Sequence, residues 1–262
     1  MHRAGDTGTV NRPIFGYDRD MEELRWLGVV RHGQSTGNPV AQQAEADRLE
    51  AIDIPERDAD VPLSDLGREQ AGAVGRWLAG LGTRVRPDLV VVSPYLRARQ
   101  TAEIAVSSLG IRSVIDERLR DRELGVLDLL TSHGVDVRLP DEAARRARLG
   151  KFYYRPPGGE SWTDVLLRLR SLLLQLRLEH PGGRVLWFAH EATVLLARYL
   201  AEGLDEAGLM TVAHAVRIAN GSISSWRRVD GLLRPELFND VAHLERDTVA
   251  PTTQEDVRAE RT

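Results

Sequence analysis

Three short apolar segments constrain the fold of this 262-residue chain most strongly, because polar residues follow each of them at once. They are residues 26–30, 89–92 and 185–189. Continuous apolar runs of this length are typical of strands that are buried on both faces of a sheet. Apolar residues at helical spacing lie between them, as in residues 162–176. Strands that alternate with helices predict an α/β fold, namely a three-layer α/β/α sandwich with a mostly parallel sheet.

The end of this pattern differs from the rest. Asn220-Gly221 lies between two segments with strand character, residues 213–218 and 222–229. Asn-Gly is a strong signal for a tight hairpin, so we expect one antiparallel strand at an edge of the sheet. Elsewhere, Ser64 is placed to cap a helix that starts near Asp65.

The apolar pattern extends over most of the chain without a linker or a repeat. We expect a single domain over residues 13–247. Residues 1–12 and 248–262 are polar and lack a periodic apolar pattern, so they are expected to be flexible tails.

Composition excludes several classes of protein. No apolar run reaches the roughly 18 residues that a membrane-spanning helix needs, and the first residues lack the apolar core of a signal peptide. We therefore expect a cytoplasmic protein without a membrane partner. The chain has no cysteine, which excludes disulfides, thiol catalysis and cysteine-ligated metals. The formal net charge of −4 does not favour nucleic acid as a partner.

The residues that follow the three apolar runs form a chemical pattern. Arg31-His32 comes after the first run, Ser93 and then Arg97 after the second, and His190 after the third. Carboxyl ends of parallel strands share one edge of a sheet, where open α/β sheets bind ligands. Two histidines and two arginines around one point predict a phosphate pocket, because guanidinium groups suit the bidentate binding of phosphate.

Cleavage of a phosphomonoester needs these groups. The arginines would neutralise the phosphate oxygens, which otherwise repel a nucleophile. A neutral imidazole of His32 would attack phosphorus to give a phosphohistidine, and His190 would donate a hydrogen bond to the transferring group. A carboxyl group would still be needed to protonate the leaving oxygen and later to activate water.

Residues 27–38 resemble the signature of the histidine phosphatase superfamily, the phosphoglycerate mutase-like proteins. Further segments resemble later landmarks of that family in the same order: 61–71, 93–102, 157–161, 188–190 and 220–222. The resemblance implies that His32 is phosphorylated, that Arg31 and Arg97 bind phosphate, and that His190 is the second histidine of the pocket. It also implies an enzyme that needs no metal and no cofactor.

The resemblance leaves the general acid open. The family usually has a Glu four residues before a Gly, and Asp121 occupies that position here, with Glu123 two residues later. Asp is one methylene shorter than Glu, so both residues remain candidates. Gln34 and Asn38 match the loop on the phosphate side. Ser161 either contacts the substrate or only starts a helix. If Glu123 is not the acid, we expect it to contact the substrate.

Two activities fit this site. A metal-independent phosphatase would hydrolyse small phosphomonoesters through a phosphohistidine on His32, whereas a mutase would return the phosphoryl group to another hydroxyl of the same substrate. Arg145-Arg146 resembles an arginine pair of true mutases, but residues 150–155 resemble phosphatase members, and we favour the phosphatase.

A binding protein without activity is disfavoured, because the two histidines and two arginines are all present. The expected partner is a small phosphorylated metabolite, and a homodimer is a possible state.

Residues 145–155 leave a second question open. They carry Arg145-Arg146, Lys151 and Arg155, with three aromatic residues at 152–154. This segment either forms a solvated basic helix face or lines the mouth of the pocket, where it would suit a substrate with an organic part beyond its phosphate.

Overall fold

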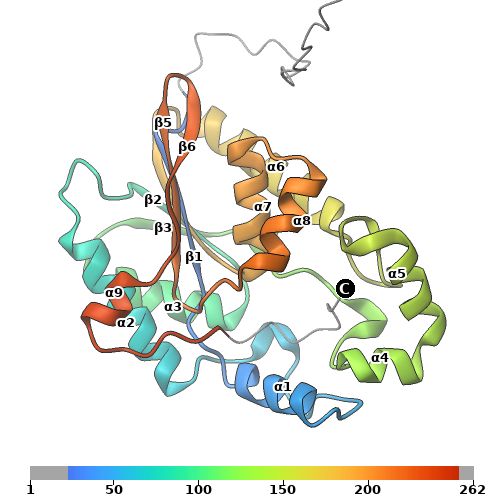
Figure 1. Ribbon diagram of the computed structural model, residues 1–262. Helices are drawn as coiled ribbons and strands as arrows, with labels where there is room; N and C mark the ends of the chain where they lie inside the picture. Colours follow the sequence, from blue (N-terminus) through green and yellow to red (C-terminus); the bar gives the residue numbers. More distant parts are fainter. Residues whose placement is uncertain (1–22, 254–262) are drawn as a thin grey trace, which may run out of the picture.

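A six-stranded sheet with helices on both faces forms the core of the protein (Figure 1). The computed structural model describes residues 23–253, so the expected tail 1–12 lies outside the described residues. The strand order is β3-β2-β4-β1-β5-β6. The strands are β1 (Trp26–Arg31), β2 (Leu89–Val92), β3 (Arg112–Ile115), β4 (Arg184–Ala189), β5 (Ile223–Val229) and β6 (Leu232–Asp240). The expected three-layer α/β/α sandwich is confirmed.

The helices cover both faces of this sheet. They are α1 (Gly37–Ala46), α2 (Asp65–Gly80), α3 (Leu96–Val106), α4 (Ser132–Arg138), α5 (Pro140–Tyr153), α6 (Trp162–Glu179), α7 (Glu191–Glu202), α8 (Glu206–Ala215) and α9 (Ala242–Arg246). One apolar cluster joins α2 and α3 to the sheet, and another joins α6, α7 and α8 to the opposite face. None of the helices within residues 23–253 combines the length and apolar character required to span a bilayer.

The register of the central strands aligns their carboxyl ends. Phe188 of β4 lies between Val30 of β1 and Val92 of β2. The backbone N–H of His32 donates to the carbonyl of Ala189 at 2.9 Å, just beyond the paired residues. The residues that follow β1, β2 and β4 therefore lie next to one another at one edge of the sheet.

The antiparallel part of the sheet differs from the prediction. Residues 213–215 belong to helix α8, so the hairpin predicted at Asn220-Gly221 is wrong. The hairpin instead joins β5 to β6 at Asp230-Gly231, where both residues have the positive φ that a tight hairpin turn requires. Asp-Gly carries the same signal as Asn-Gly, so local sequence alone could not choose between them. β5 runs antiparallel to β1, and β6 pairs beyond it at the edge.

The expected C-terminal tail begins too early. Val249 is buried, and Gln70 of α2 donates a hydrogen bond to the carbonyl of Ala250 at 2.9 Å. Residues 248–253 are therefore part of the folded domain, although their sequence is polar. Tertiary hydrogen bonds hold them, and such bonds leave no periodic pattern in the sequence. The predicted cap of α2 is confirmed, because Ser64 Oγ accepts from the N–H of Gly67 at 3.0 Å.

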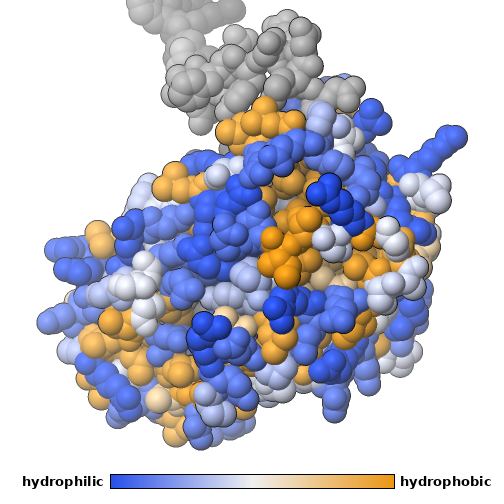
Figure 2. All heavy atoms as spheres, turned by 180° about the vertical axis from the view of Figure 1, so that it is seen from behind, coloured by the Kyte–Doolittle hydropathy of each residue, from blue (hydrophilic) through white to orange (hydrophobic). Residues whose placement is uncertain are grey.

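The face seen in Figure 2 is mainly polar, with apolar side chains gathered in several separate groups. Helix α6 contributes three exposed leucines, Leu167, Leu174 and Leu178. A homodimer could bury exposed leucines such as these, and the homodimer stays a prediction.

Candidate active site

The structure brings the residues of the sequence pattern together at the carboxyl edge of the sheet. Arg31 ends β1 and His32 follows it, His190 follows β4, and Arg97 lies in the first turn of α3. All four side chains are buried, and the ring centroids of His32 and His190 are 5.2 Å apart. Ser93 follows β2, and its Oγ lies 2.8 Å from His190 Nε2.

The hydrogen bonds of His32 determine which ring nitrogen carries the proton. Its Nδ1 lies 2.7 Å from the carbonyl oxygen of Gly33. A carbonyl oxygen only accepts, so Nδ1 carries the hydrogen and Nε2 keeps its lone pair. Nε2 accepts a hydrogen bond from Nε of Arg97 at 3.2 Å. The unprotonated nitrogen therefore faces the guanidinium group that is expected to bind phosphate.

Gly33 allows the loop after His32 to pack closely against α2. A Cβ at this position would lie 2.3 Å from the carbonyl oxygen of Gly67, a distance that no side chain tolerates. The N–H of Gly33 donates to Thr101 Oγ1 at 3.0 Å. The loop is thus held by α2 and α3, the two helices on one face of the sheet.

Arg97 is surrounded by acceptors on three sides. Its Nη1 donates to the backbone carbonyl of Asp58 at 2.6 Å and to the Asp58 carboxylate at 3.2 Å, while Nη2 donates to Asp121 Oδ2 at 3.1 Å. Asp58 begins a short 3₁₀ helix, Asp58–Asp60. Sequence reasoning missed Asp58, because it lies in a polar segment without a motif. An anion that binds Arg97 has to share this guanidinium with Asp58.

Arg31 is held from the opposite side of the site. Its side chain is completely buried, and Nη1 lies 3.9 Å from the Glu191 carboxylate and donates to the carbonyl of Ile218. The N–H of Ile218 in turn donates to the other oxygen of Glu191 at 3.3 Å. Sequence reasoning missed Glu191 as well, although its position directly after His190 in the first turn of α7 was a usable signal.

The structure separates the two candidates for the general acid. Asp121 is buried, and its Oδ2 lies 3.4 Å from His190 Nδ1 in addition to its contact with Arg97. Glu123 is exposed, and its carboxylate accepts from the hydroxyl of Tyr95 at 2.9 Å. Burial and the nearby carboxylates of Asp121, Asp58 and Glu123 raise the pKa of Tyr95 far above its ordinary value, so the phenol stays a donor. Of the two candidate acids, Asp121 contacts both His190 and Arg97, whereas the described contacts of Glu123 include neither.

Helix α6 explains how the shorter side chain of Asp121 reaches the site. Arg168 of α6 donates to the backbone carbonyl of Asp121 at 3.1 Å and forms an ion pair with Glu160 at 3.0 Å. The side chain of Arg122 donates to the carbonyl of Glu160 at 2.7 Å. These contacts hold the backbone around Asp121, whose side chain contacts Arg97 although it is one methylene shorter than glutamate.

The remaining predicted residues have different surroundings. Gln34 Oε1 accepts from the hydroxyl of Ser64 at 2.8 Å, and its N–H donates to Gln70. Asn38 Oδ1 accepts from the N–H of Ser35 at 2.8 Å, and Asn38 lines a small cavity of about 50 Å³ together with Arg97. Ser161 caps α6 in a capping box, so the structure places its hydroxyl at a helix start.

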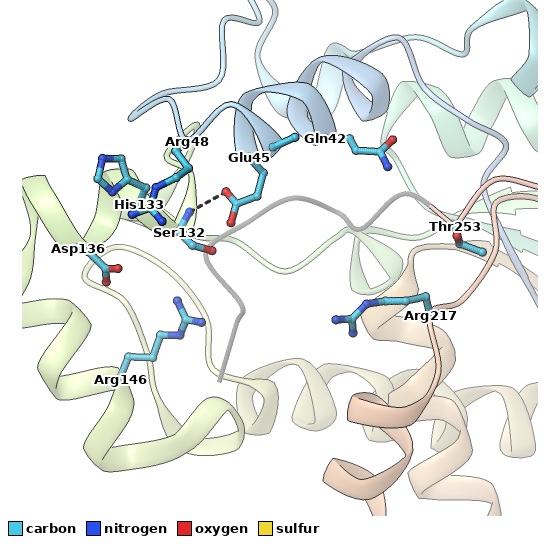
Figure 3. A pocket seen from close by; sticks show the side chains of 10 residues that line it. Gln42, Glu45, Arg48, Ser132, His133, Asp136, Arg146, Arg217 and Thr253 are labelled. Carbon is cyan, nitrogen blue, oxygen red and sulfur yellow. Dashed lines mark hydrogen bonds between the residues drawn. The ribbon is translucent and has the colours of Figure 1, made fainter.

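A larger cavity of about 680 Å³ opens between α1, α4, α5 and the segment after α8 (Figure 3). Arg146 of α5 and Arg217 extend into it from opposite sides (Figure 3). Arg217 precedes Ile218, whose carbonyl accepts from Arg31, so the cavity wall and the site are neighbours along the chain at this point. The other lining residues are Gln42, Glu45, Ala46, Arg48, Ser132, His133, Asp136 and Thr253.

The segment 145–155 combines the two roles that the sequence left open. Arg146 faces the cavity, whereas Phe152 and Tyr154 are buried core residues. Tyr153 is exposed and lies against the ring of Phe152. The arginine, and not the aromatic residues, therefore lines the cavity.

Within residues 23–253, no three histidine, aspartate or glutamate side chains are grouped so that they could hold a metal ion. The carboxylates near the site, Asp58 and Asp121, are paired with Arg97. The donors that converge here are guanidinium and imidazole nitrogens, which suit an anionic ligand.

Comparison with known proteins agrees with this geometry. The sequence profile of the histidine phosphatase superfamily (branch 1) matches residues 27–241. The chain belongs to this superfamily.

Individual relatives include both activities that the sequence left open. The 2,3-bisphosphoglycerate-dependent phosphoglycerate mutase of Methylorubrum extorquens (strain PA1) is 30% identical over 202 residues, 75% of this chain and 86% of the mutase. The glucosyl-3-phosphoglycerate phosphatase of Mycobacterium tuberculosis is 34% identical over 161 residues, 61% of this chain and 64% of that protein. A solved structure of a mycobacterial glucosyl-3-phosphoglycerate phosphatase complexed with VO3 is similar with a TM-score of 0.66 and 28% identity, and the match covers 83% of this chain and 100% of that one.

Proposed function

We propose that this protein is a metal-independent phosphatase that hydrolyses small phosphomonoesters through a phosphohistidine on His32. One observation carries the proposal. His32 Nε2, the nitrogen with the lone pair, lies 3.2 Å from Nε of Arg97, and the same guanidinium contacts the buried carboxylate of Asp121. The proposed nucleophile and the proposed acid therefore both contact the guanidinium that is proposed to bind phosphate, which is the arrangement that a phosphoryl transfer requires.

The first half of the reaction forms the phosphoenzyme. His32 Nε2 attacks phosphorus, and the bond from phosphorus to the ester oxygen breaks. Asp121, protonated in the complex, gives its proton to the leaving alkoxide, so that the alcohol departs neutral. Arg31 and Arg97 hold the equatorial oxygens, and His190 donates to the group in transfer.

The second half regenerates the enzyme. Asp121, now a carboxylate, takes a proton from a water molecule whose oxygen attacks phosphorus. The bond between phosphorus and His32 Nε2 breaks, and inorganic phosphate leaves. The imidazole recovers its lone pair, while Nδ1 keeps its hydrogen on the Gly33 carbonyl throughout.

The cavity beside the site suggests the kind of substrate. A volume of about 680 Å³ accommodates the organic part of a small metabolite, and its lining is mainly polar and charged. Arg146 and Arg217 extend into it from opposite walls (Figure 3). The polar lining supports a phosphomonoester whose remainder is polar.

A mutase is the second candidate, because of its relative from Methylorubrum extorquens and the arginine pair 145–146. Both activities use the same phosphohistidine, and they differ only in the acceptor. The assay therefore has to separate release of phosphate from its return to the substrate.

We expect release of inorganic phosphate from a panel of small phosphomonoesters in the presence of EDTA. The panel includes 3-phosphoglycerate with 2,3-bisphosphoglycerate, and the isomer and free phosphate are both quantified. Free phosphate without an isomerised product supports the phosphatase. Isomerisation without release supports the mutase, and a complete loss of activity in EDTA that a divalent ion restores contradicts metal independence.

Asp58 provides a separate prediction. Asp58→Asn is expected to tighten competitive inhibition by inorganic phosphate by about fivefold, because phosphate no longer competes with a carboxylate for Arg97. Asp60→Asn is the matched control, since Asp60 lies in the same turn but, among the described ion pairs, pairs with exposed Arg57 and not with Arg97. The control is expected to change the inhibition constant by less than about twofold. Weaker inhibition in Asp58→Asn alone would contradict competition.

A further inference from the structure

The segment that follows α9 reaches back to the loop that carries His32. The backbone carbonyl of Thr252 accepts from the N–H of Asn220 at 2.8 Å, and its hydroxyl donates to Asn220 Oδ1 at 3.0 Å. The same hydroxyl accepts from Gln70 Nε2 at 3.2 Å. One threonine side chain therefore joins two polar side chains from distant parts of the chain, 32 and 182 residues away in sequence.

Both partners of Thr252 hold the backbone of the catalytic loop. Asn220 Nδ2 donates to the carbonyl of His32 at 3.2 Å, and Gln70 Oε1 accepts from the N–H of Gln34 at 2.8 Å. Asn220 and Gln70 are completely buried. Their remaining polar atoms point away from the loop, and Thr252 binds one such atom of each.

We propose that Thr252 is a positioning residue for the reaction at His32. Its hydroxyl fixes the amide orientations of Asn220 and Gln70, so that each directs its other end to the loop of residues 32–34. Asn220 offers its Nδ2 to His32 only when its Oδ1 faces a donor, and the Thr252 hydroxyl is that donor. Gln70 offers its Oε1 to Gln34 only when its Nε2 faces acceptors, which are Thr252 Oγ1 and the carbonyl of Ala250.

The chemistry of the amide group explains why one hydroxyl suffices. A hydroxyl donates one hydrogen and accepts others, so it serves an amide oxygen and an amide nitrogen at once. Without it, the buried Asn220 oxygen lacks its side-chain donor, and a rotation of the amide would present that oxygen to the carbonyl of His32. Two facing oxygens repel each other. The loop would move, and with it the alignment of His32 Nε2.

The test compares four variants. Thr252→Val removes the hydroxyl and keeps the shape, and Thr252→Ala removes it without placing a new methyl group in a polar network. Thr252→Ser keeps the hydroxyl. Thr211→Val is the matched control, because it removes a threonine hydroxyl at an exposed position of α8, where Thr211 donates to the carbonyl of Ala207 and does not line the large cavity.

We expect Thr252→Val and Thr252→Ala to lower kcat by about tenfold with little change in KM, while Thr252→Ser and Thr211→Val stay within about twofold of the parent. The kinetic part rests on the proposed phosphatase function. A second readout does not: the imidazole nitrogen signals of His32 in NMR spectra are expected to shift in Thr252→Val and Thr252→Ala but not in Thr252→Ser.

The outcomes separate the two proposals. If the parent protein releases no phosphate but the His32 signals shift as expected, the positioning role stands and the phosphatase function fails. Folded Thr252→Val or Thr252→Ala with parental kcat and unshifted His32 signals would overturn the positioning role. Equal impairment of Thr252→Ser would overturn it too, because the hydroxyl would then not matter. If Thr252→Val does not fold, Thr252→Ala decides.

Discussion

Replacing His32 with alanine is expected to lower phosphatase turnover by roughly four orders of magnitude or more, because the variant lacks the proposed acceptor of the phosphoryl group. His32 is completely buried between Arg97 and the Gly33 carbonyl, so the variant also loses two hydrogen bonds. Each such bond contributes about 1 kcal/mol to stability, and the fold is expected to persist. Phosphate release from a small phosphomonoester, together with the circular dichroism spectrum, measures both effects.

A matched histidine control is available at the opposite end of the sheet. His180 lies 2.5 Å from Asp88, just before β2, far from the carboxyl edge where the site lies. His180→Ala is expected to keep full turnover. Residual activity of a folded His32→Ala variant within about tenfold of the parent would mean that another group is the nucleophile.

Replacing Asp121 with asparagine is expected to lower the rate with alkyl phosphates by about 100- to 1,000-fold, but the rate with p-nitrophenyl phosphate by less than about tenfold. Alkoxides are strongly basic and need a proton as they leave, whereas p-nitrophenolate leaves without one. Because Asp121 also contacts Arg97, KM is expected to change for both substrates alike. The ratio of the two rates therefore isolates the role of Asp121 as an acid.

Glu123→Gln is the control for this series. Its side chain is exposed and accepts only from Tyr95 and not from Arg97 or His190 among the described contacts, so the leaving-group ratio is expected to stay at the parental value. If the ratio of the two rates changes in Glu123→Gln and not in Asp121→Asn, Glu123 is the general acid.

Much of the fold and the centre of the site follow from the sequence. The buried runs at 26–30, 89–92 and 185–189 predict three strands of one sheet, since apolar runs without alternation belong to strands covered on both faces. The residues directly after these runs then have to meet, because parallel strands end at one edge. This is why the sequence alone predicts that Arg31, His32 and His190 lie together.

The partners of these residues could not be predicted in the same way. Asp58, Glu191 and Thr252 contact residues that are distant in sequence, and such contacts leave no period and no spacing. The hairpin at Asp230-Gly231 was missed because Asn220-Gly221 carries an equivalent local signal. In the structure, Asn220-Gly221 instead holds the loop after β1, because the N–H of Gly221 donates to the carbonyl of Arg31 at 3.0 Å.

The choice between the two acids shows the same limit. Spacing pointed to Asp121 and side-chain length argued against it, so the sequence left both residues open. In the structure, Arg97 pairs with Asp121, and Arg168 of α6 holds the backbone carbonyl of Asp121. These contacts depend on how α6 packs against the loop, which spacing in the sequence does not show.

The most direct measurement is a rapid chemical quench of the protein during turnover of a ³²P-labelled phosphomonoester, followed by mapping of the labelled peptide. The phosphohistidine account predicts a label on residue 32 that is lost in acid, is stable in alkali and forms as fast as the substrate is consumed. Full turnover with no label on that residue at any quench time would contradict it.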